Sequence, residues 1–307
     1  MARSPSQTAL LIGEPERAPR PPVPAPSGEG PWRRSWQRLC HRPAALIALA
    51  LLGAVALLCV IVPVLSPYGY ATPDWNALFQ PPGWPHLFGT DDLGRDELVR
   101  VMWGCRISLL IGITASFVSV VIGVVWGAAA GYAGGSVDSL MMRLVDVLYT
   151  VPFIPLVIVL TVLFGRSFIL VFVAIGAVSW LDIARIVRGQ TLSLKNREFV
   201  AAARALGVPA PTMIARHLVP NLLGIVIIYA TLTIPAVILF EAFLSFLGLG
   251  VHAPLASLGT LVSAGTNHMQ SHPYLLVIPS IFLTLIICCF SYLGDGLRDA
   301  LDPRERR

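Results

Sequence analysis

The chain has 307 residues, of which 55% are hydrophobic and only 13% are charged, and its mean hydropathy is +0.74. This composition excludes an ordinary soluble domain and indicates an integral membrane protein. The formal net charge of +5 comes from basic residues dispersed between apolar stretches, which argues against a nucleic-acid-binding face.

The N-terminal segment is rich in proline, with eight prolines in residues 1–31. Such a segment cannot build a packed core, so residues 1–31 are predicted to be a disordered cytoplasmic tail, and a basic pre-membrane segment completes the region 1–42. The first apolar stretch starts near residue 43 and lacks a small-residue cleavage site. This argues against a cleavable signal peptide.

Apolar stretches of about 20 residues, the length needed to cross about 30 Å of hydrocarbon, recur along the chain. The six predicted spans are approximately 43–65, 107–132, 147–165, 167–188, 221–246 and 274–294. The fourth is the weakest, because Asp182 and Arg185 would have to lie at the membrane edge or face protein. Residues 43–106 then form a first transmembrane helix with an extracytoplasmic segment, and 107–296 form the transmembrane core.

Basic residues are concentrated on one side of these spans. They precede span one, lie between spans two and three and between spans four and five, and follow span six. The outer loop 247–273 contains no lysine or arginine. Because basic loops stay on the cytoplasmic side, both termini are predicted to be cytoplasmic, including the tail 297–307.

Span two has a row of small residues at every fourth position. The row is Ala115, Ser119, Gly123, Gly127 and Gly131. In lipid such a row lets a second helix approach closely, and simple helix packing is its commonest role. A functional interpretation adds that sparse contacts let helices slide during alternating access.

Spans three and five contain residues that are unusual in a membrane helix. Pro152 and Pro155 are expected to bend span three, which leaves backbone carbonyls in need of neighbours or water. Glu241 lies toward the outer end of span five. It is interpreted as a helix-packing hydrogen bonder, a residue lining a translocation path, or the relay of an ion-coupled carrier.

The longest polar interruption, residues 188–221, carries five basic residues and one acid, Glu198. Its alanines favour a helix, and the Gly-Val-Pro-Ala-Pro run predicts an end to that helix and the start of a second short one. Because a helix face that carries only small side chains fits closely into a partner's groove, the first helix is interpreted as a docking element. The alternative interpretation is an ordinary amphipathic surface helix. The predicted docking positions within loop 189–220 are Glu198, Ala201, Ala202, Ala203, Gly207 and Pro220.

The outer segment before span two contains the run GTDDLGRD, residues 89–96. Thr90 and the acids after it are expected to cap a short helix on the outer surface. The charged side chains of the run are expected to form a solvated, salt-bridged face. These side chains are Asp91, Asp92, Arg95 and Asp96.

The chain lacks the residues that a primary pump or a metal site requires. Its one lysine, Lys195, follows a leucine, so no P-loop is present and ATP is expected to be hydrolysed elsewhere. His268 and His272 could share a metal on a helix, but two ligands do not close a site, and loop histidines near an interface are the alternative.

The polar loop resembles the EAA loop of binding-protein-dependent ABC importer permeases. In that loop an alanine pair lies four residues before a glycine, and a proline follows thirteen residues later. Here these places are occupied by Ala202, Ala203, Gly207 and Pro220. Ala201 departs from the glutamate of the general motif. Residues 198–200, Glu-Phe-Val, instead fit the form of the dipeptide/oligopeptide/nickel branch.

Four further motifs match that branch. They are GTDDLGRD at 89–96, GYAGG at 131–135 with Arg143 and Asp146, LSFLGLG at 244–250, and GLRDALDP at 296–303. The resemblance runs from about residue 40 to residue 303. The chain is similar to the second, C-type permease of a dipeptide/oligopeptide-class importer.

The resemblance implies an all-α integral membrane fold with six transmembrane helices: a five-helix core of the type I importer (MetI-like) kind plus a peripheral first helix. It implies a heterodimer with a second homologous permease, two cytoplasmic ABC ATPase subunits, an extracytoplasmic solute-binding protein, and a place in the bacterial inner membrane.

The same resemblance implies that this chain holds no catalytic residue, cofactor or metal, and that the partner ATPases use ATP and magnesium. Di- or oligopeptides are the expected substrates, and nickel or another small solute is the alternative within the same architecture. A proton- or ion-coupled secondary carrier that acts alone, with Glu241 as its relay, is the alternative class.

Overall fold

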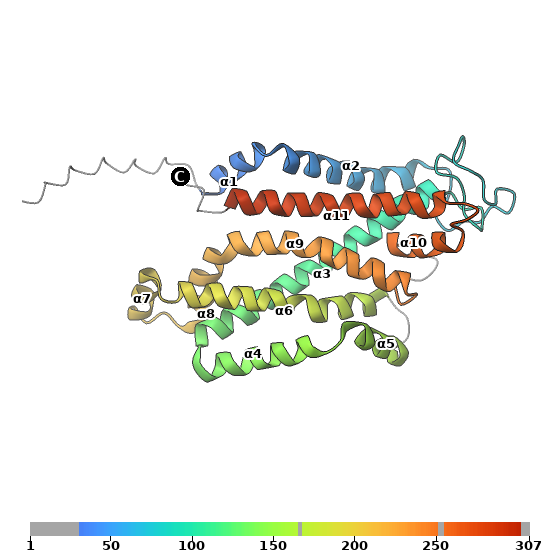
Figure 1. The fold of residues 1–307 in the computed structure, drawn as a ribbon. Helices are drawn as coiled ribbons and strands as arrows, with labels where there is room; N and C mark the ends of the chain where they lie inside the picture. Colours follow the sequence, from blue (N-terminus) through green and yellow to red (C-terminus); the bar gives the residue numbers. More distant parts are fainter. Residues whose placement is uncertain (1–30, 165–167, 251–254, 302–307) are drawn as a thin grey trace, which may run out of the picture.

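The computed structural model describes residues 31–164, 168–250 and 255–301, and these ranges are all-helical, without a strand. Long helices lie side by side in Figure 1. The elements are α1 (Pro31–Cys40), α2 (Pro43–Leu65), α3 (Glu97–Ala133), α4 (Gly135–Thr150), α5 (Phe153–Phe164), α6 (Phe168–Leu194), α7 (Glu198–Ala205), α8 (Ala210–Thr212), the π-helix η3 (Met213–Leu218), α9 (Val219–Phe246), α10 (Leu258–Asn267) and α11 (Tyr274–Leu301).

Four of the described helices are long and apolar enough to cross a membrane: α2, α3, the continuous stretch Ala210–Phe246, and α11. The bent pair α4 and α5 makes a fifth candidate if it counts as one span. α6 has 27 residues and is about 40 Å long at 1.5 Å per residue, which is also enough to cross. Five of the six predicted spans therefore fall on one helix each, and the third falls on the bent pair α4 and α5.

The predicted bend in span three is present, and it divides the span into two helices. α4 and α5 meet at 80° across a two-residue break that contains Pro152. Pro152 has no N–H for a helical hydrogen bond, and its ring disfavours helical backbone at Val151. Pro155 lies in the first turn of α5, where the missing N–H costs nothing, so only one of the two prolines causes the bend.

The prediction of a separate surface helix before span two is wrong. α3 starts at Glu97, ten residues before the predicted span, and runs unbroken for 37 residues. Asp96 caps it by accepting a hydrogen bond of 2.9 Å from the Val99 N–H, so Thr90 is not the cap. No proline interrupts residues 97–133, and the segment predicted as two helices forms one.

α3 occupies the centre of the bundle and packs against α2, α4, α6 and α9. The largest buried cluster joins α2, α3, α9, α10 and α11 around residues such as Met102, Leu258 and Ile286. α2 lies at one side of the bundle in Figure 1 and packs on α3 and α11. The N-terminal residues 1–30 and the tail 302–307, for which a disordered tail and a basic end were predicted, lie outside the described residues.

The two ends of the bundle differ in content. α1, α7, α8 and the C-terminal end of α11 lie at the left of Figure 1, whereas α10 and the 66–96 segment lie at the right. At the left end, an ion pair of 2.9 Å between Arg42 and Asp299 joins the start of α2 to the end of α11. Leu39 of α1 is buried there against Ala300.

Candidate functional site in the polar loop and the helix bundle

α7 packs one face on the bundle and exposes the other. Val200 and Ala203 are buried in one cluster with Met213 and Leu218 of η3. Ala201 and Ala202, one helical step away, are exposed, as is Glu198 in the first turn. The buried face fixes α7 on η3, which leads into α9, and the exposed face presents the methyl groups of Ala201 and Ala202 at its centre.

The end of α7 has the hydrogen-bond pattern of a Schellman motif. Gly207 N–H donates to the Arg204 carbonyl at 3.0 Å, and Val208 N–H donates to the Ala203 carbonyl at 3.2 Å. Gly207 has φ of +76°, a left-handed conformation that glycine adopts without strain. The turn leaves Leu206 85% exposed, so an apolar side chain projects from the tip of the loop.

The second short helix of the loop leads directly into α9. Pro209 is the N-cap of α8, and η3 then continues into α9 without an intervening coil. Pro220 is exposed in the first turn of α9, immediately after the π-helical segment. Since proline cannot donate to the carbonyl four residues earlier, a local departure from α-helical bonding beside it is expected.

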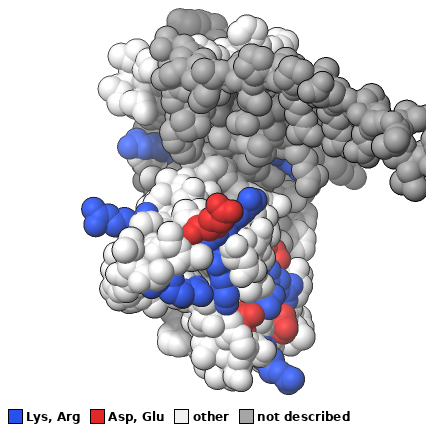
Figure 2. All heavy atoms as spheres, turned by 90° about the vertical axis from the view of Figure 1, so that its left-hand side faces the viewer, with Lys and Arg blue, Asp and Glu red and all other residues white. Residues whose placement is uncertain are grey.

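Basic side chains tie the loop to the end of α3. Lys195 Nζ donates to the carbonyls of Gly131 and Tyr132 at 3.4 and 3.1 Å, and Arg204 lies over the Tyr132 ring at 5.6 Å. A cation at a helix C-terminus is favourable because the last carbonyls carry partial negative charge. Figure 2 shows this end of the molecule, where Lys and Arg cover more of the visible surface than Asp and Glu.

The small-residue row of α3 lies against α6. A Cβ added at Gly123 would lie 2.7 Å from the Ile183 Cβ, and one at Gly127 would overlap the Ala184 carbonyl oxygen. One at Gly131 would lie 2.8 Å from the Thr191 Cβ. Ala115 and Ser119, earlier in the row, are fully buried. The row therefore sets the close approach of α3 and α6, the most extensive helix pair in the bundle.

Two arginines of α6 pair with acids of α4. Arg188 donates to both carboxylate oxygens of Asp138 at 2.6 and 2.7 Å, the bidentate geometry that guanidinium groups favour. Arg185 donates to Asp146 at 2.9 Å. Of the two charges that weakened the prediction of span four, Arg185 thus pairs with α4, whereas Asp182 is exposed.

Glu241 is fully buried and holds three helices together. Ser108 of α3 donates to one carboxylate oxygen at 3.1 Å, and Ser245 donates to the other at 2.7 Å. Ser108 Oγ also accepts the Leu258 N–H at 3.2 Å, at the start of α10. With an exposed fraction of 0%, Glu241 reaches no surface of this chain, so its geometry is that of a packing residue rather than a path-lining one.

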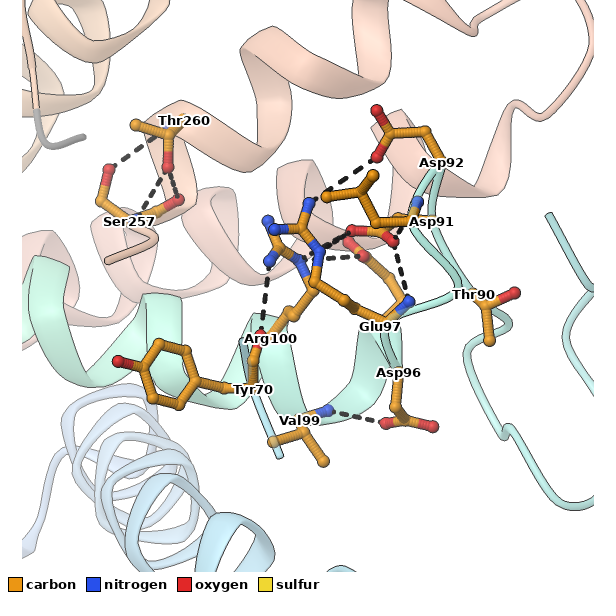
Figure 3. Close-up of polar contacts among 12 residues, drawn as sticks. Tyr70, Thr90, Asp91, Asp92, Asp96, Glu97, Val99, Arg100, Ser257 and Thr260 are labelled. Carbon is orange, nitrogen blue, oxygen red and sulfur yellow. Dashed lines mark hydrogen bonds and ion pairs between the residues drawn. The ribbon is translucent and has the colours of Figure 1, made fainter. Parts of the chain in front are cut away.

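The charged run of the outer segment is mostly buried, so the prediction of a solvated face is wrong for it. Asp91, Glu97 and Arg100 are only 6%, 2% and 7% exposed. Figure 3 shows Arg100 and Glu97 turned toward Asp91, with Arg100 Nε 3.2 Å from the Asp91 carboxylate. The 66–96 segment folds over the start of α3 and buries most of these side chains. Of the four predicted residues, only Asp92 keeps a half-exposed side chain.

Thr90 fixes this segment instead of capping a helix. Its hydroxyl accepts the Gln80 N–H at 2.8 Å and donates to the Ala77 carbonyl, and its own carbonyl accepts from the Tyr274 hydroxyl at 2.8 Å. His268 and His272 both contact the Phe79 ring, with centroid distances of 5.0 and 4.3 Å. Among the described residues no three His, Cys, Asp or Glu side chains are grouped to hold a metal.

Sequence reasoning missed two of these features. The Asp138–Arg188 pair joins residues 50 positions apart, and it cannot be found without knowing that α4 and α6 are neighbours. The Glu97–Arg100 pair had a local sign, since residues three apart share a helix face, but its burial depends on the fold of the preceding segment.

Comparison with known proteins places the chain in a family. Residues 123–307 match the family described as the inner membrane component of binding-protein-dependent transport systems, and residues 30–82 match the N-terminal transmembrane domain of oligopeptide transport permease C. The chain belongs to this permease family. It is therefore a multi-pass membrane transport subunit of an ATP-driven importer and not an enzyme, and ATP hydrolysis resides in separate subunits.

Members of this permease family are similar over nearly the whole chain. Identity is 50% to the oligopeptide transport permease OppC of Escherichia coli and 49% to that of Haemophilus influenzae, over 91% of this chain and 93% and 90% of those proteins. It is 43% to the dipeptide transport permease DppC of Bacillus subtilis, over 89% of this chain and 86% of that protein.

The fold also occurs among solved structures. A chain of the inward-facing MetNI methionine ABC transporter is similar with a TM-score of 0.54 and 18% identity, over 67% of this chain and 98% of that chain. This likeness confirms the predicted MetI-like permease fold. As a member of the family, the chain works with a second permease, ATPases and a binding protein.

Proposed function

We propose that this chain is the C-type permease of a di- or oligopeptide importer in the bacterial inner membrane. The observation that carries the proposal is identity of about half to curated oligopeptide permeases over 91% of the chain. The second permease is a similar but distinct protein, and the path runs along the interface between the two. An extracytoplasmic solute-binding protein delivers the peptide to the end that carries α10.

We place two ATPase subunits against the polar loop, with their ATP and magnesium held entirely by those subunits. The exposed Ala201–Ala202 face of α7 is smooth enough to enter a groove, and the buried residues of α7 contact η3, which continues into α9. Movement of an ATPase therefore passes through Val200 and Ala203 to Met213 and Leu218, and so to a membrane helix. When ATP closes the ATPase dimer, the loop transmits that movement to α9, and the path opens outward.

This proposal places the loop end and both termini in the cytoplasm. The described basic residues of the loop, together with Arg298 near the end of α11, support that orientation because basic segments stay inside. Figure 1 shows α1, α7 and the end of α11 at one end of the bundle, so a single orientation satisfies all of them.

The enclosure of Glu241 disfavours a secondary carrier as the alternative. A relay must exchange protons or ions with water on each side in turn, and both carboxylate oxygens of Glu241 are occupied by serine hydroxyls inside the bundle. In the described part of the chain, Glu241 is the one acid of the apolar half of α9, and no second acid continues a relay from it.

The experiment that tests the substrate assignment is purification of the cognate binding protein and identification of its bound ligand by mass spectrometry. A mixture of short peptides is the expected result, and co-purification of this chain with a second permease and two ATPases is the expected assembly. A binding protein that carries nickel or a non-peptide solute would contradict the peptide assignment and leave the ABC architecture in place.

A further inference from the structure

α6 has one face that no other described helix covers. The opposite face packs on α3 through Ile183, Ala184 and Val187, while α4 and α9 contact α6 from either side. Figure 1 shows α6 between α4 and α9, with α3 crossing behind. The uncovered face carries Asp182 and Gly189, close to two helical turns apart, and both are exposed.

In the proposed orientation, the length of α6 places Asp182 within the thickness of the membrane. α6 begins at Phe168, at the end of the bundle where the outer segments lie, and a rise of 1.5 Å per residue places Asp182 about 21 Å along it. The hydrocarbon core is about 30 Å thick. Because a charged side chain in lipid is expensive, charged residues at this depth face the interior of the protein or a water-filled cavity.

The charged neighbours of Asp182 are already paired. Arg188 binds Asp138 and Arg185 binds Asp146, so these four charges compensate one another. No described side chain forms a hydrogen bond or ion pair with Asp182, which leaves one exposed negative charge on this face. The described chain therefore supplies no partner for this charge, which leaves water, a passing cation, lipid or the second permease beside it, and of these lipid is the most costly for a charge.

We propose that this face of α6 lines the aqueous path, and that Asp182 there attracts the cationic groups of passing peptides. The inference rests on the proposed function, since it takes a peptide as the substrate. A peptide carries an ammonium group and, where it contains lysine or arginine, further positive charge. An unpaired carboxylate in a narrow path with low-dielectric walls is complementary to these groups, so Asp182 favours cationic over anionic peptides.

Water access is tested first and needs no substrate. Asp182→Cys is introduced into the assembled transporter, with the two exposed native cysteines, Cys40 and Cys288, changed to serine. Open membrane vesicles are treated with a charged, membrane-impermeant methanethiosulfonate. Modification at position 182 is expected. The control is Phe117→Cys on α3, where the native apolar side chain is 68% exposed, and this cysteine is expected to stay unmodified because the site faces lipid. An unreactive Asp182→Cys places the face against lipid or the second permease and overturns the proposal.

Charge selection is tested in the same assembled transporter with saturating binding protein. The ratio of uptake rates for a lysine-containing and a glutamate-containing tripeptide is compared between the unmodified transporter and Asp182→Asn. The ratio is expected to fall about five-fold, because an amide keeps the size and loses the charge. The matched control is Asp295→Asn, which neutralises an exposed acid on α11 away from α6 and should leave the ratio unchanged.

Each outcome of the second test is decisive. An equal loss for both peptides means that Asp182 acts only in structure, and an unchanged ratio means that it does not face the substrate; either result overturns the proposal. If the transporter without substitutions carries neither peptide, the proposed peptide function fails. The labelling experiment still decides whether position 182 is reached by water, because it uses no substrate.

Discussion

Gly207 allows the coupling role of the loop to be separated from its stability. With φ of +76°, any other residue there is strained, but a Cβ at this position would meet no atom within 4 Å. Replacement by aspartate therefore costs about 1 kcal/mol of backbone strain and nothing in steric overlap. Such a cost changes the unfolding equilibrium by roughly five-fold, which is too small to abolish the folded protein in the membrane.

The chain offers a matched control for this substitution. Gly248 has φ of +73° and equally open surroundings, but it lies beyond the end of α9, at the other end of the bundle from the loop. Gly248→Asp carries the same backbone cost without touching the proposed ATPase contact. Gly207→Asn is the second control, since asparagine tolerates a left-handed conformation and adds no charge.

We expect Gly207→Asp to lower peptide uptake by roughly ten-fold or more, which corresponds to about 1.4 kcal/mol of lost coupling. Gly248→Asp should retain nearly all uptake, and Gly207→Asn should lie between the two. The assay measures labelled-peptide uptake and ATPase activity of reconstituted transporters at matched protein abundance. Equal losses for the two aspartate variants would show that backbone strain, and not contact at the loop, explains the effect and would refute the reasoning.

Three further predictions concern packing and orientation. Glu241→Gln should keep part of the uptake, still dependent on ATP, because an amide oxygen continues to accept a serine hydroxyl; complete loss of uptake would contradict the packing role. Gly127→Ala should lower the melting temperature through about 1–3 kcal/mol of overpacking against α6, while Gly53→Ala, with no atom within 4 Å of its new Cβ, should leave it unchanged or raise it. A cysteine at Leu206, 85% exposed, should be labelled by an impermeant reagent only from the cytoplasm, and one at Trp84, 91% exposed, only from outside; the reverse pattern would invert the proposed topology.

The features that the sequence predicted well are local ones. The helix that ends at Ala205 and the second short helix after the break at Gly207 follow from alanine content and from a glycine before Val-Pro, and both need only neighbours in sequence. Apolar length located the helices of all six predicted spans, because membrane thickness fixes what a span needs. The small-residue row also indicated a close helix contact, although its partner, α6, could not be named from the sequence.

The features that were mispredicted depend on distant parts of the chain. The acids of residues 89–96 look solvent-exposed in sequence, but the 66–96 segment folds back on α3 and buries Asp91 beside Arg100. Likewise, the number of prolines in span three did not reveal that one of them, Pro152, would separate two helices at 80°. Whether a proline bends, breaks or merely starts a helix depends on where the helix begins, and packing decides that.

The most direct test of the account is the energy source of transport in proteoliposomes that contain this chain, its second permease and the two ATPases. With the binding protein outside and ATP with magnesium at the ATPases, labelled peptide should accumulate, and collapsing the proton gradient should leave the rate unchanged. Uptake that proceeds without ATP and stops when the proton gradient is removed would contradict the central claim that this chain is the permease of an ATP-driven importer.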